Sequence, residues 1–84
     1  MERHAAILVL DEAMRAVAER RGLALASPSV AALDDPLEDL GLDSRSYAEL
    51  IDELERRLAR EIPFEDSLEV RTVRELIALF AGSP

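Results

Sequence analysis

Apolar residues recur at helical spacing in three stretches of the chain, and no stretch alternates convincingly as a strand would. The first stretch runs from about Glu2 to Arg21, with an apolar stripe of Ile7, Leu10, Met14 and Val17. Arg20 and Arg21 suit the negative C-terminal end of a helix, and Gly22 is placed to cap it. The pattern therefore predicts a helix over residues 2–21.

The second helical stretch runs from about Ser44 to Arg60, and its apolar positions are Tyr47, Leu50, Ile51, Leu54 and Leu58. Two pairs of opposite charge four residues apart, each with the acid first, support this helix: Asp52 with Arg56 and Glu53 with Arg57. Pro63 follows and blocks its continuation.

The last stretch opens with a capping box, Thr72-Val73-Arg74-Glu75, and its stripe is Val73, Leu76, Ile77 and Phe80. Gly82 is placed to end this helix, and a shorter helix is expected within Phe64–Val70. We therefore expect an all-α fold, a small antiparallel bundle of three longer helices plus one short helix. Residues 1–84 are expected to form a single domain.

The connection between the first two helices is long, and Pro28 and Pro36 interrupt it. Asp35-Pro36 has the pattern of a cap followed by a first-turn proline, opening a short turn that Gly41 ends. Seven apolar residues of this loop are suited to the core: Leu23, Leu25, Val30, Leu33, Leu37, Leu40 and Leu42. Loops of this length in small domains are usually functional or mobile.

The composition is that of a small globular protein, with 84 residues, 49% hydrophobic and 33% charged. It has no cysteine, which excludes disulfides and cysteine-based zinc sites. No apolar run approaches the ~18 residues that a membrane span requires. The start, Met1-Glu2-Arg3-His4, carries an acid and lacks the cleavage site of a signal peptide. We expect a cytoplasmic monomer without membrane contact.

The net charge of −8 is concentrated in residues 34–55, which hold nine acids against the single base Arg45. The remainder of the chain is balanced, with nine acids and nine bases. An acidic segment of this kind repels nucleic acid and attracts basic protein surfaces. By itself, however, an acidic cluster favours the simpler interpretation of a solvated face that keeps a small protein soluble.

The sequence lacks features that three possible catalytic or metal-binding sites would require. A nucleophilic Ser44 lacks flanking glycines, and the only histidine, His4, is forty residues away. With Gly41 at the sixth position of an EF-hand loop, only Glu38 among positions one, three, five and twelve is a carboxylate. Paired acids such as Asp34-Asp35 lack an evident walled cleft. We expect neither a catalytic residue nor a metal site.

Ser44 therefore has two remaining roles at the start of the second helix. A phosphate ester on it would lie at the positive helix end, beside unpaired backbone N–H groups. Alternatively, Ser44 or Asp43 accepts a hydrogen bond from those N–H groups as an ordinary cap. Local rules leave both open, since Ser46-Tyr47-Ala48-Glu49 is the better capping box.

Four motifs follow one another in residues 37–81: LEDLGLDS at 37–44, Glu49-Leu50 with Leu54-Glu55, EIP at 61–63, and TVRELIALF at 72–80. This series resembles the acyl carrier proteins, so the resemblance implies that residues 1–84 form a single acyl-carrier-like domain. The resemblance implies that Ser44, preceded by Gly41-Leu42-Asp43, carries a covalent 4'-phosphopantetheine arm, which a phosphopantetheinyl transferase adds from coenzyme A. Acyl or polyketide intermediates would then be held on the thiol of the arm as thioesters.

The resemblance also implies that the second helix docks on basic patches of partner enzymes, such as acyl-loading enzymes, a ketosynthase or other biosynthetic enzymes. Glu49 and Glu55 occupy matching acidic positions, and Asp39 and Asp43 lie just before the helix. The base that activates Ser44 would belong to the transferase, and this chain would be a non-catalytic carrier.

Arg45 departs from the family pattern, in which leucine or methionine follows the serine. We expect it to have a specificity role, either toward the phosphate of the arm or toward a carboxylate on one partner. The alternative is a solvent-exposed arginine that is tolerated at a surface site. A peptidyl carrier usually has a second glycine and a histidine or aspartate before its serine, so Leu42-Asp43 favours the acyl type. An aminoacyl or peptidyl carrier, or an acidic carrier-like adaptor without a prosthetic group, remains an alternative.

Overall fold

The computed structural model describes residues 1–29 and 32–81, and its regular elements in these ranges are all helical. The helices are α1 (Arg3–Arg21), the 3-10 helix η2 (Leu37–Leu40), α2 (Ser44–Leu58), α3 (Phe64–Ser67) and α4 (Val73–Ala81). The predicted all-α fold of three longer helices and one short helix is confirmed. Val30 and Gly82, to which a core position and a helix end were assigned, lie outside the described residues.

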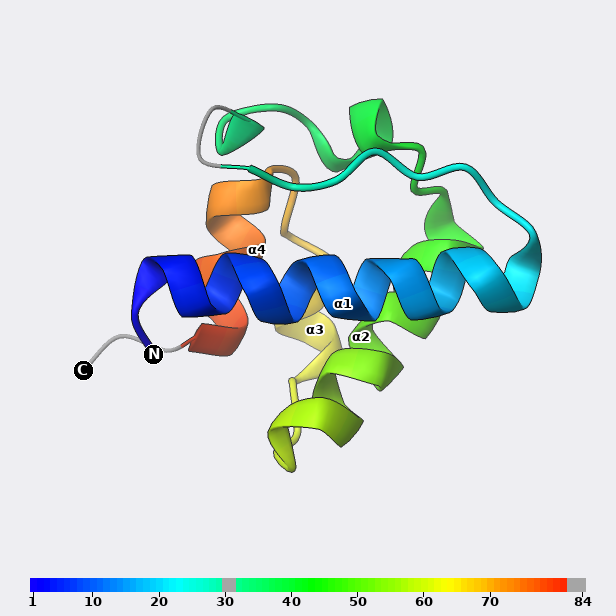
Figure 1. Ribbon diagram of the computed structural model, residues 1–84. Coiled ribbons are helices and arrows are strands. Elements are labelled where there is room, and N and C mark those ends of the chain that lie inside the picture. Colours follow the sequence, from blue (N-terminus) through cyan, green and yellow to red (C-terminus); the bar gives the residue numbers. More distant parts are fainter. Residues whose placement is uncertain (30–31, 82–84) are drawn as a thin grey trace.

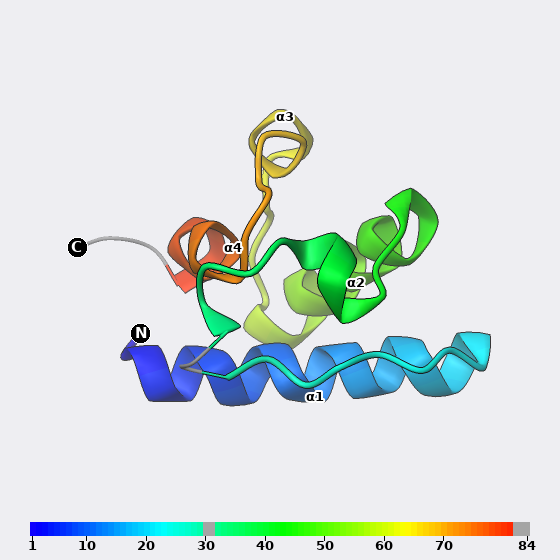
Figure 2. The ribbon, with the colours of Figure 1, turned by 90° about the horizontal axis from the view of Figure 1, so that it is seen from above.

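Helix α1 forms one side of the molecule, and α2 and α4 pack against it. Helix α4 lies against the first half of α1 and α2 against the second half (Figure 1). Figure 2 shows α3 on the side of the molecule farthest from α1. After α1, residues 23–29 run back along that helix, and residues 32–40 run in the opposite direction toward the start of α2 (Figure 1).

The core lies where α1, α2 and α4 meet. Its largest fully buried side chains are Phe80, Leu10, Met14, Leu50, Leu54 and Leu76. These positions belong to the apolar stripes of the three longer helices, which confirms the faces predicted from periodicity. Leu33, Leu37, Leu40 and Leu42 of the long loop are buried on the same core.

Helix ends follow local capping, with two small differences from expectation. Glu2 is the N-cap of α1 and accepts hydrogen bonds from the His4 and Ala5 N–H groups, so the helix begins at Arg3. Gly22 caps its other end at a φ of 66°, as expected. Helix α2 ends at Leu58 rather than Arg60, because Ala59 adopts the left-handed conformation and ends the helix.

Two details of the long loop were predicted wrongly. Leu23 is 37% exposed, because it follows the Gly22 turn at the outer end of α1. Pro36, rather than Asp35, is the N-cap residue of η2. Pro36 stays extended because the next residue, Leu37, donates its N–H to the Arg71 carbonyl at 2.8 Å.

Gly41 ends η2 as expected and sets the approach to α2. Its φ is 97°, and an added Cβ would lie 3.1 Å from both the Ala24 carbonyl oxygen and Leu25 Cδ2. Only glycine meets both conditions without strain. The tight packing of Gly41 against the returning loop therefore fixes the position from which α2 begins.

The predicted capping box at the start of α4 is confirmed. The Glu75 N–H donates to Thr72 Oγ1 at 3.2 Å, and the Thr72 N–H donates to Glu75 Oε1 at 3.1 Å.

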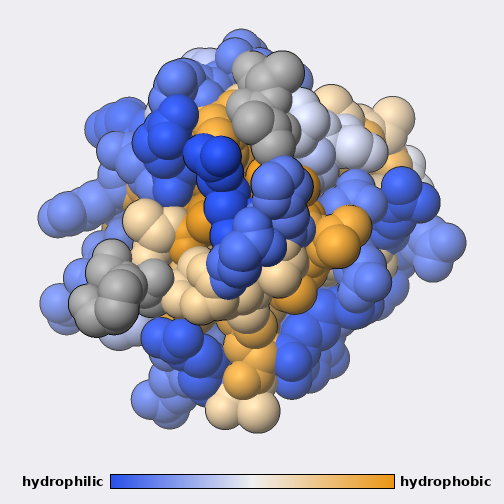
Figure 3. Space-filling model, turned by 60° about the vertical axis from the view of Figure 1, so that its left-hand side comes forward, coloured by the Kyte–Doolittle hydropathy of each residue, from blue (hydrophilic) through white to orange (hydrophobic). Residues whose placement is uncertain are grey.

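On the face that Figure 3 shows, apolar side chains gather at the centre, with hydrophilic side chains on either side of them. The apolar interior therefore reaches the surface in a limited area of this face.

Candidate functional site

Helix α2 is capped by Asp43 and Ser46, and this pairing leaves Ser44 out of the cap. The Asp43 carboxylate accepts a hydrogen bond from the Ser46 N–H at 2.7 Å, and the Asp43 N–H donates to Ser46 Oγ at 2.9 Å. The two residues thus form a reciprocal capping box. The expected box of Ser46 with Glu49 is wrong, because Ser46 Oγ bonds backward to Asp43 and the Glu49 carboxylate faces α1.

Ser44 is the first residue of α2, and its side chain is exposed. Its hydroxyl forms no hydrogen bond with any residue in the described ranges. The Ser46 N–H is the main cause that lowers the pKa of Asp43, and the Ser46 hydroxyl and the Arg21 charge act in the same direction. Ser44 therefore presents an unused hydroxyl at the positive end of a helix, beside an ionised aspartate.

An apolar groove of about 350 Å³ begins at Ser44 and separates α2 from α3. Its walls include Tyr47, Ala48 and Ile51 on one side and Phe64 and Leu68 on the other. Phe64 is 68% exposed and Leu68 is 63% exposed, so large apolar side chains face solvent at this groove. Exposed apolar surface of this kind is typical of a binding site.

Tyr47 connects the two walls of the groove. Its hydroxyl donates to the Ser67 backbone carbonyl at 2.6 Å, which ties α2 to α3. Burial raises the pKa of Tyr47 to about 12, so the phenol remains a donor throughout the neutral range. This contact holds the short helix α3 at a fixed distance from Ser44.

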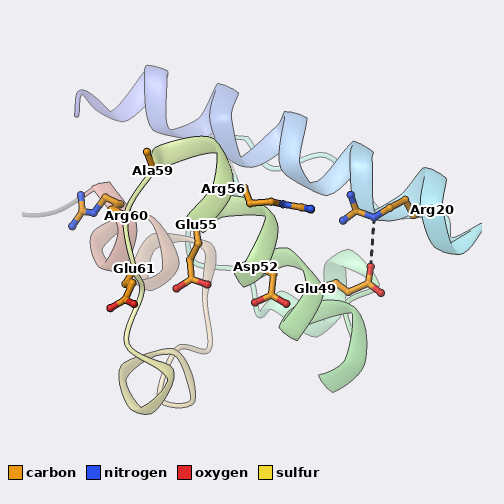
Figure 4. Close-up of a pocket in the computed structure, with 8 residues that line it drawn as sticks. All are labelled: Arg20, Glu49, Asp52, Glu55, Arg56, Ala59, Arg60 and Glu61. Atoms are coloured by element: carbon orange, nitrogen blue, oxygen red, sulfur yellow. Dashed lines mark ion pairs between the residues drawn. The ribbon is translucent and has the colours of Figure 1, made fainter.

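Glu49, one of the expected docking acids, is paired within the protein. Its carboxylate lies 2.8 Å from Arg21 Nε and 3.9 Å from Arg20 Nε of α1. The Arg20–Glu49 pair is drawn in Figure 4. Any partner that binds Glu49 must therefore compete with two arginines of this chain.

Glu53 is the centre of a second cluster between α1 and α2. It is only 7% exposed, and its carboxylate accepts hydrogen bonds from Arg20 and Arg57, each at 2.8 Å, and from Arg56. The Arg20 bond is the largest cause that lowers the pKa of Glu53 to about 2. The predicted Glu53–Arg57 pair is confirmed. The predicted Asp52–Arg56 pair is wrong, because Arg56 turns to the buried carboxylate instead.

The remaining acids of α2, together with Glu61 of the segment that follows it, lie around a charged hollow of about 660 Å³. Asp52, Glu55 and Glu61 project to the side away from α1 (Figure 4). Glu55 is half-buried, and its carboxylate accepts a hydrogen bond from the Ile62 N–H at 2.7 Å. This bond ties the segment that follows α2 to the helix. Asp52 is exposed and forms no ion pair with a residue in 1–29 or 32–81.

Asp39 and Arg45 are exposed on either side of the Asp43-Ser44 pair. Asp39 lies in η2, and neither side chain forms an ion pair within the part of the chain that the structure describes. Arg45 is the second residue of α2. Of the residues expected to bind partners, these two are therefore the most available.

His4, the single histidine, is bonded to Glu2 at the start of α1. Residues 1–29 and 32–81 contain no group of three or more potential metal ligands. In the same ranges, no helix combines the length and apolarity that a membrane span requires.

Sequence reasoning missed the structural roles of Ser46 and Glu53 and the contribution of Phe64 and Leu68 to the groove. The spacing of Ser46 three residues after Asp43 was a usable signal for the capping box. No local signal indicates that Glu53 is buried, because its contact with Arg20 depends on how α1 crosses α2.

A model of one protein family, described as a phosphopantetheine attachment site, matches residues 13–80 of this chain. No curated protein matches this chain. The matched range begins inside α1, extends to Phe80 of α4 and includes Ser44 and the groove. Carrier domains of this family hold a covalently bound 4'-phosphopantetheine group and are generally non-catalytic. Because the match covers most of the chain, this protein belongs to the phosphopantetheine-attachment-site family and is a phosphopantetheine carrier.

Proposed function

We propose that the Ser44 hydroxyl is the attachment point of the 4'-phosphopantetheine arm. The observation that carries this proposal is that Asp43 and Ser46 complete the cap of α2 between them. Ser44 is thereby exposed at the helix start with no structural task. An anionic phosphodiester at this place is favoured by the positive end of α2.

The residues around Ser44 fit the group. The oxygen of Ser44 would hold it covalently, and the apolar groove that begins there would receive the arm or its cargo. When bound, the group supplies a thiol that carries acyl intermediates as thioesters. Tyr47, Phe64 and Leu68 would exclude water from whatever occupies the groove.

The chain accepts the arm and does not attach it by itself. Loss of the Ser44 proton requires a base, yet the only histidine lies at the start of α1 and the sequence contains no lysine. The adjacent carboxylate of Asp43 is committed to the Ser46 N–H, and its pKa is lowered, which makes it a weak base. A phosphopantetheinyl transferase would therefore supply both the base and coenzyme A.

The proposed cargo is an acyl or polyketide intermediate, and residues 1–84 act as one carrier domain. Support comes from Leu42-Asp43 before the serine and from the apolar lining of the groove. An aminoacyl or peptidyl carrier is the alternative. Comparing a neutral acyl thioester with an aminoacyl thioester of equal length separates them, since the acyl proposal expects only the former to shift the resonances of Tyr47 and Phe64.

Incubation with coenzyme A and a broad-specificity transferase tests the proposal. Intact mass should show one arm on each chain, because Ser44 is exposed at the start of α2. A chain that stays unmodified while a known carrier in the same tube is loaded would favour the adaptor without a prosthetic group.

Partner docking should depend on acids of the 34–55 segment, and most strongly on those that are not already paired within the protein. We propose Asp39, Glu49 and Glu55 as docking acids, with Asp52 added because it is exposed and unpaired in the described ranges. Changing Asp39 and Asp52 together to asparagine should weaken transferase binding about two- to tenfold at low salt without loss of stability. Reversal of Glu49 would instead place a base against Arg20 and Arg21, so it would report on folding.

The control is Glu19→Gln, which removes an exposed acid from α1 outside this segment. Affinity should also fall as salt rises, because exposed charges are screened within ~10 Å at 0.1 M. Equal affinities for the control and the double variant, or affinity that is independent of salt, would reduce the acidic segment to a solvated face.

A further inference from the structure

Arg45 is an exposed arginine for which the fold provides no use. Its side chain forms neither an ion pair nor a hydrogen bond with residues 1–29 or 32–81. The one acid at helical spacing, Glu49, is occupied by Arg21 at 2.8 Å and is also approached by Arg20. Arg45 and Glu49 are four residues apart, a spacing that allows an ion pair in a helix, and the structure does not form it.

The position of Arg45 is also unfavourable for a positive charge. It is the second residue of α2, where the helix dipole places its positive end. Asp43, the nearest preceding acid, already accepts hydrogen bonds from Ser46 as the helix cap. Local stability therefore gives no reason for an arginine here.

A negative group is nevertheless expected next to it. Family membership assigns the chain a phosphopantetheine arm, and the attachment at Ser44 would place a phosphodiester one residue before Arg45. That phosphodiester would also lie beside the ionised carboxylate of Asp43, which repels it. A guanidinium is suited to offset this repulsion, because its planar fork donates two parallel hydrogen bonds to phosphate oxygens.

We propose that Arg45 is a positioning residue that binds the phosphodiester of the arm on Ser44 and so holds the attached end of the arm against the start of α2. This inference rests on the proposed attachment at Ser44. It makes Arg45 part of the loaded state of the carrier, rather than a residue that reads partner enzymes directly. The residues that the structure describes offer no counterpart for this side chain, so the order of the Arg45 side chain should depend on loading.

The experiment compares unfolding by urea at low ionic strength for the apo and loaded forms of the full chain. For each variant, the effect of loading is the unfolding equilibrium constant of the loaded form divided by that of the apo form. This ratio should be about two- to fivefold higher for Arg45→Leu than for the wild type, which is the range of an exposed charge pair. Arg45→Gln should behave like Arg45→Leu, and Arg45→Lys should fall between them and the wild type.

Arg3→Leu is the matched control. Arg3 is also an exposed arginine in the first turn of a helix that follows an acidic N-cap, and it forms no ion pair in the described ranges. Arg3→Leu therefore measures the general effect of removing one positive charge from an acidic protein. Its ratio of loaded to apo unfolding constants should equal that of the wild type.

A second readout is the Nε–H resonance of Arg45, which should shift and exchange more slowly with water when the wild type is loaded. Full loading with equal ratios in all variants and an unchanged Nε–H resonance would overturn the role of Arg45 and leave the attachment at Ser44 intact. A wild-type chain that intact mass shows to be unloaded would overturn both proposals.

Discussion

Ser44→Ala should take up no phosphopantetheine and should fold as well as the wild type. The side chain is exposed and forms no hydrogen bond within the described ranges, so its loss removes no folding interaction. Alanine is also favourable inside a helix. We expect a change in the free energy of unfolding of less than about 0.5 kcal/mol. Intact mass after incubation with coenzyme A and a transferase measures loading, and urea unfolding measures stability.

Ser46→Ala is the matched control, and it should lose stability while it still accepts the arm. Ser46 is fully buried and completes the capping box with Asp43, so its loss should cost about 1 kcal/mol. Its end-point loading should nevertheless reach one arm per chain. The pair of variants thus separates the structural role of Ser46 from the proposed attachment at Ser44. Arm uptake by Ser44→Ala, or its complete absence in Ser46→Ala, would contradict the assignment.

Glu53→Gln should destabilise the protein by about 2 kcal/mol at pH 7. The carboxylate is buried and accepts hydrogen bonds from arginines of both α1 and α2, and a neutral amide cannot replace them all. We discount the larger value typical of a fully buried ion pair, because the arginine side chains are 35–66% exposed. A loss of this size is serious for a domain of 84 residues, whose total stability is on the order of 4–13 kcal/mol.

The same cluster predicts a pH dependence. Arg20 and its neighbours lower the pKa of Glu53 from 4.5 to about 2, so the stabilisation is complete above pH 4.5 and is lost as the pH falls toward 2. Glu53→Gln lacks this ionisation and should lose less stability over that interval. Asp52→Asn, which removes an exposed neighbouring acid, is the control. Parallel acid unfolding curves for the wild type and Glu53→Gln would show that Glu53 does not carry the effect.

Sequence periodicity was sufficient for the helices because each of the three longer ones buries a continuous stripe. Leu10, Leu54 and Phe80 were all placed on the correct face, and all three are fully buried. The Thr72–Glu75 box was also correct, since both partners lie within one turn of the chain. Features that depend on local spacing alone were therefore predictable.

The start of α2 shows where local spacing fails. Asp43 with Ser46 and Ser46 with Glu49 both satisfy the three-residue separation of a capping box. The choice between them depends on Arg21, which draws Glu49 toward α1 and is distant in the sequence. Ser44 was predicted from the resemblance to be the modified residue. Its freedom from the cap follows from the Asp43–Ser46 box, and the choice of that box over Ser46–Glu49 depends on this tertiary contact.

Charge was the least predictable property of the site. The sequence places the whole net charge of −8 in residues 34–55, which suggests a uniformly acidic surface. In the structure, arginines of α1 pair with Glu49, and arginines of α1 and α2 pair with the buried Glu53. The exposed acids of this segment whose carboxylates form no ion pair or hydrogen bond in the described ranges are Asp35, Glu38, Asp39 and Asp52. The burial of Glu53 requires the crossing of α1 over α2, which no pattern within either helix specifies.

Mapping the arm on the loaded wild-type chain tests the central claim most directly. After incubation with coenzyme A and the transferase, proteolysis and fragmentation of the modified peptide locate the added mass on one residue. We predict that it lies on Ser44 alone. An arm on Ser46, Ser67 or any other residue, or no arm while a control carrier is fully loaded, would contradict the account.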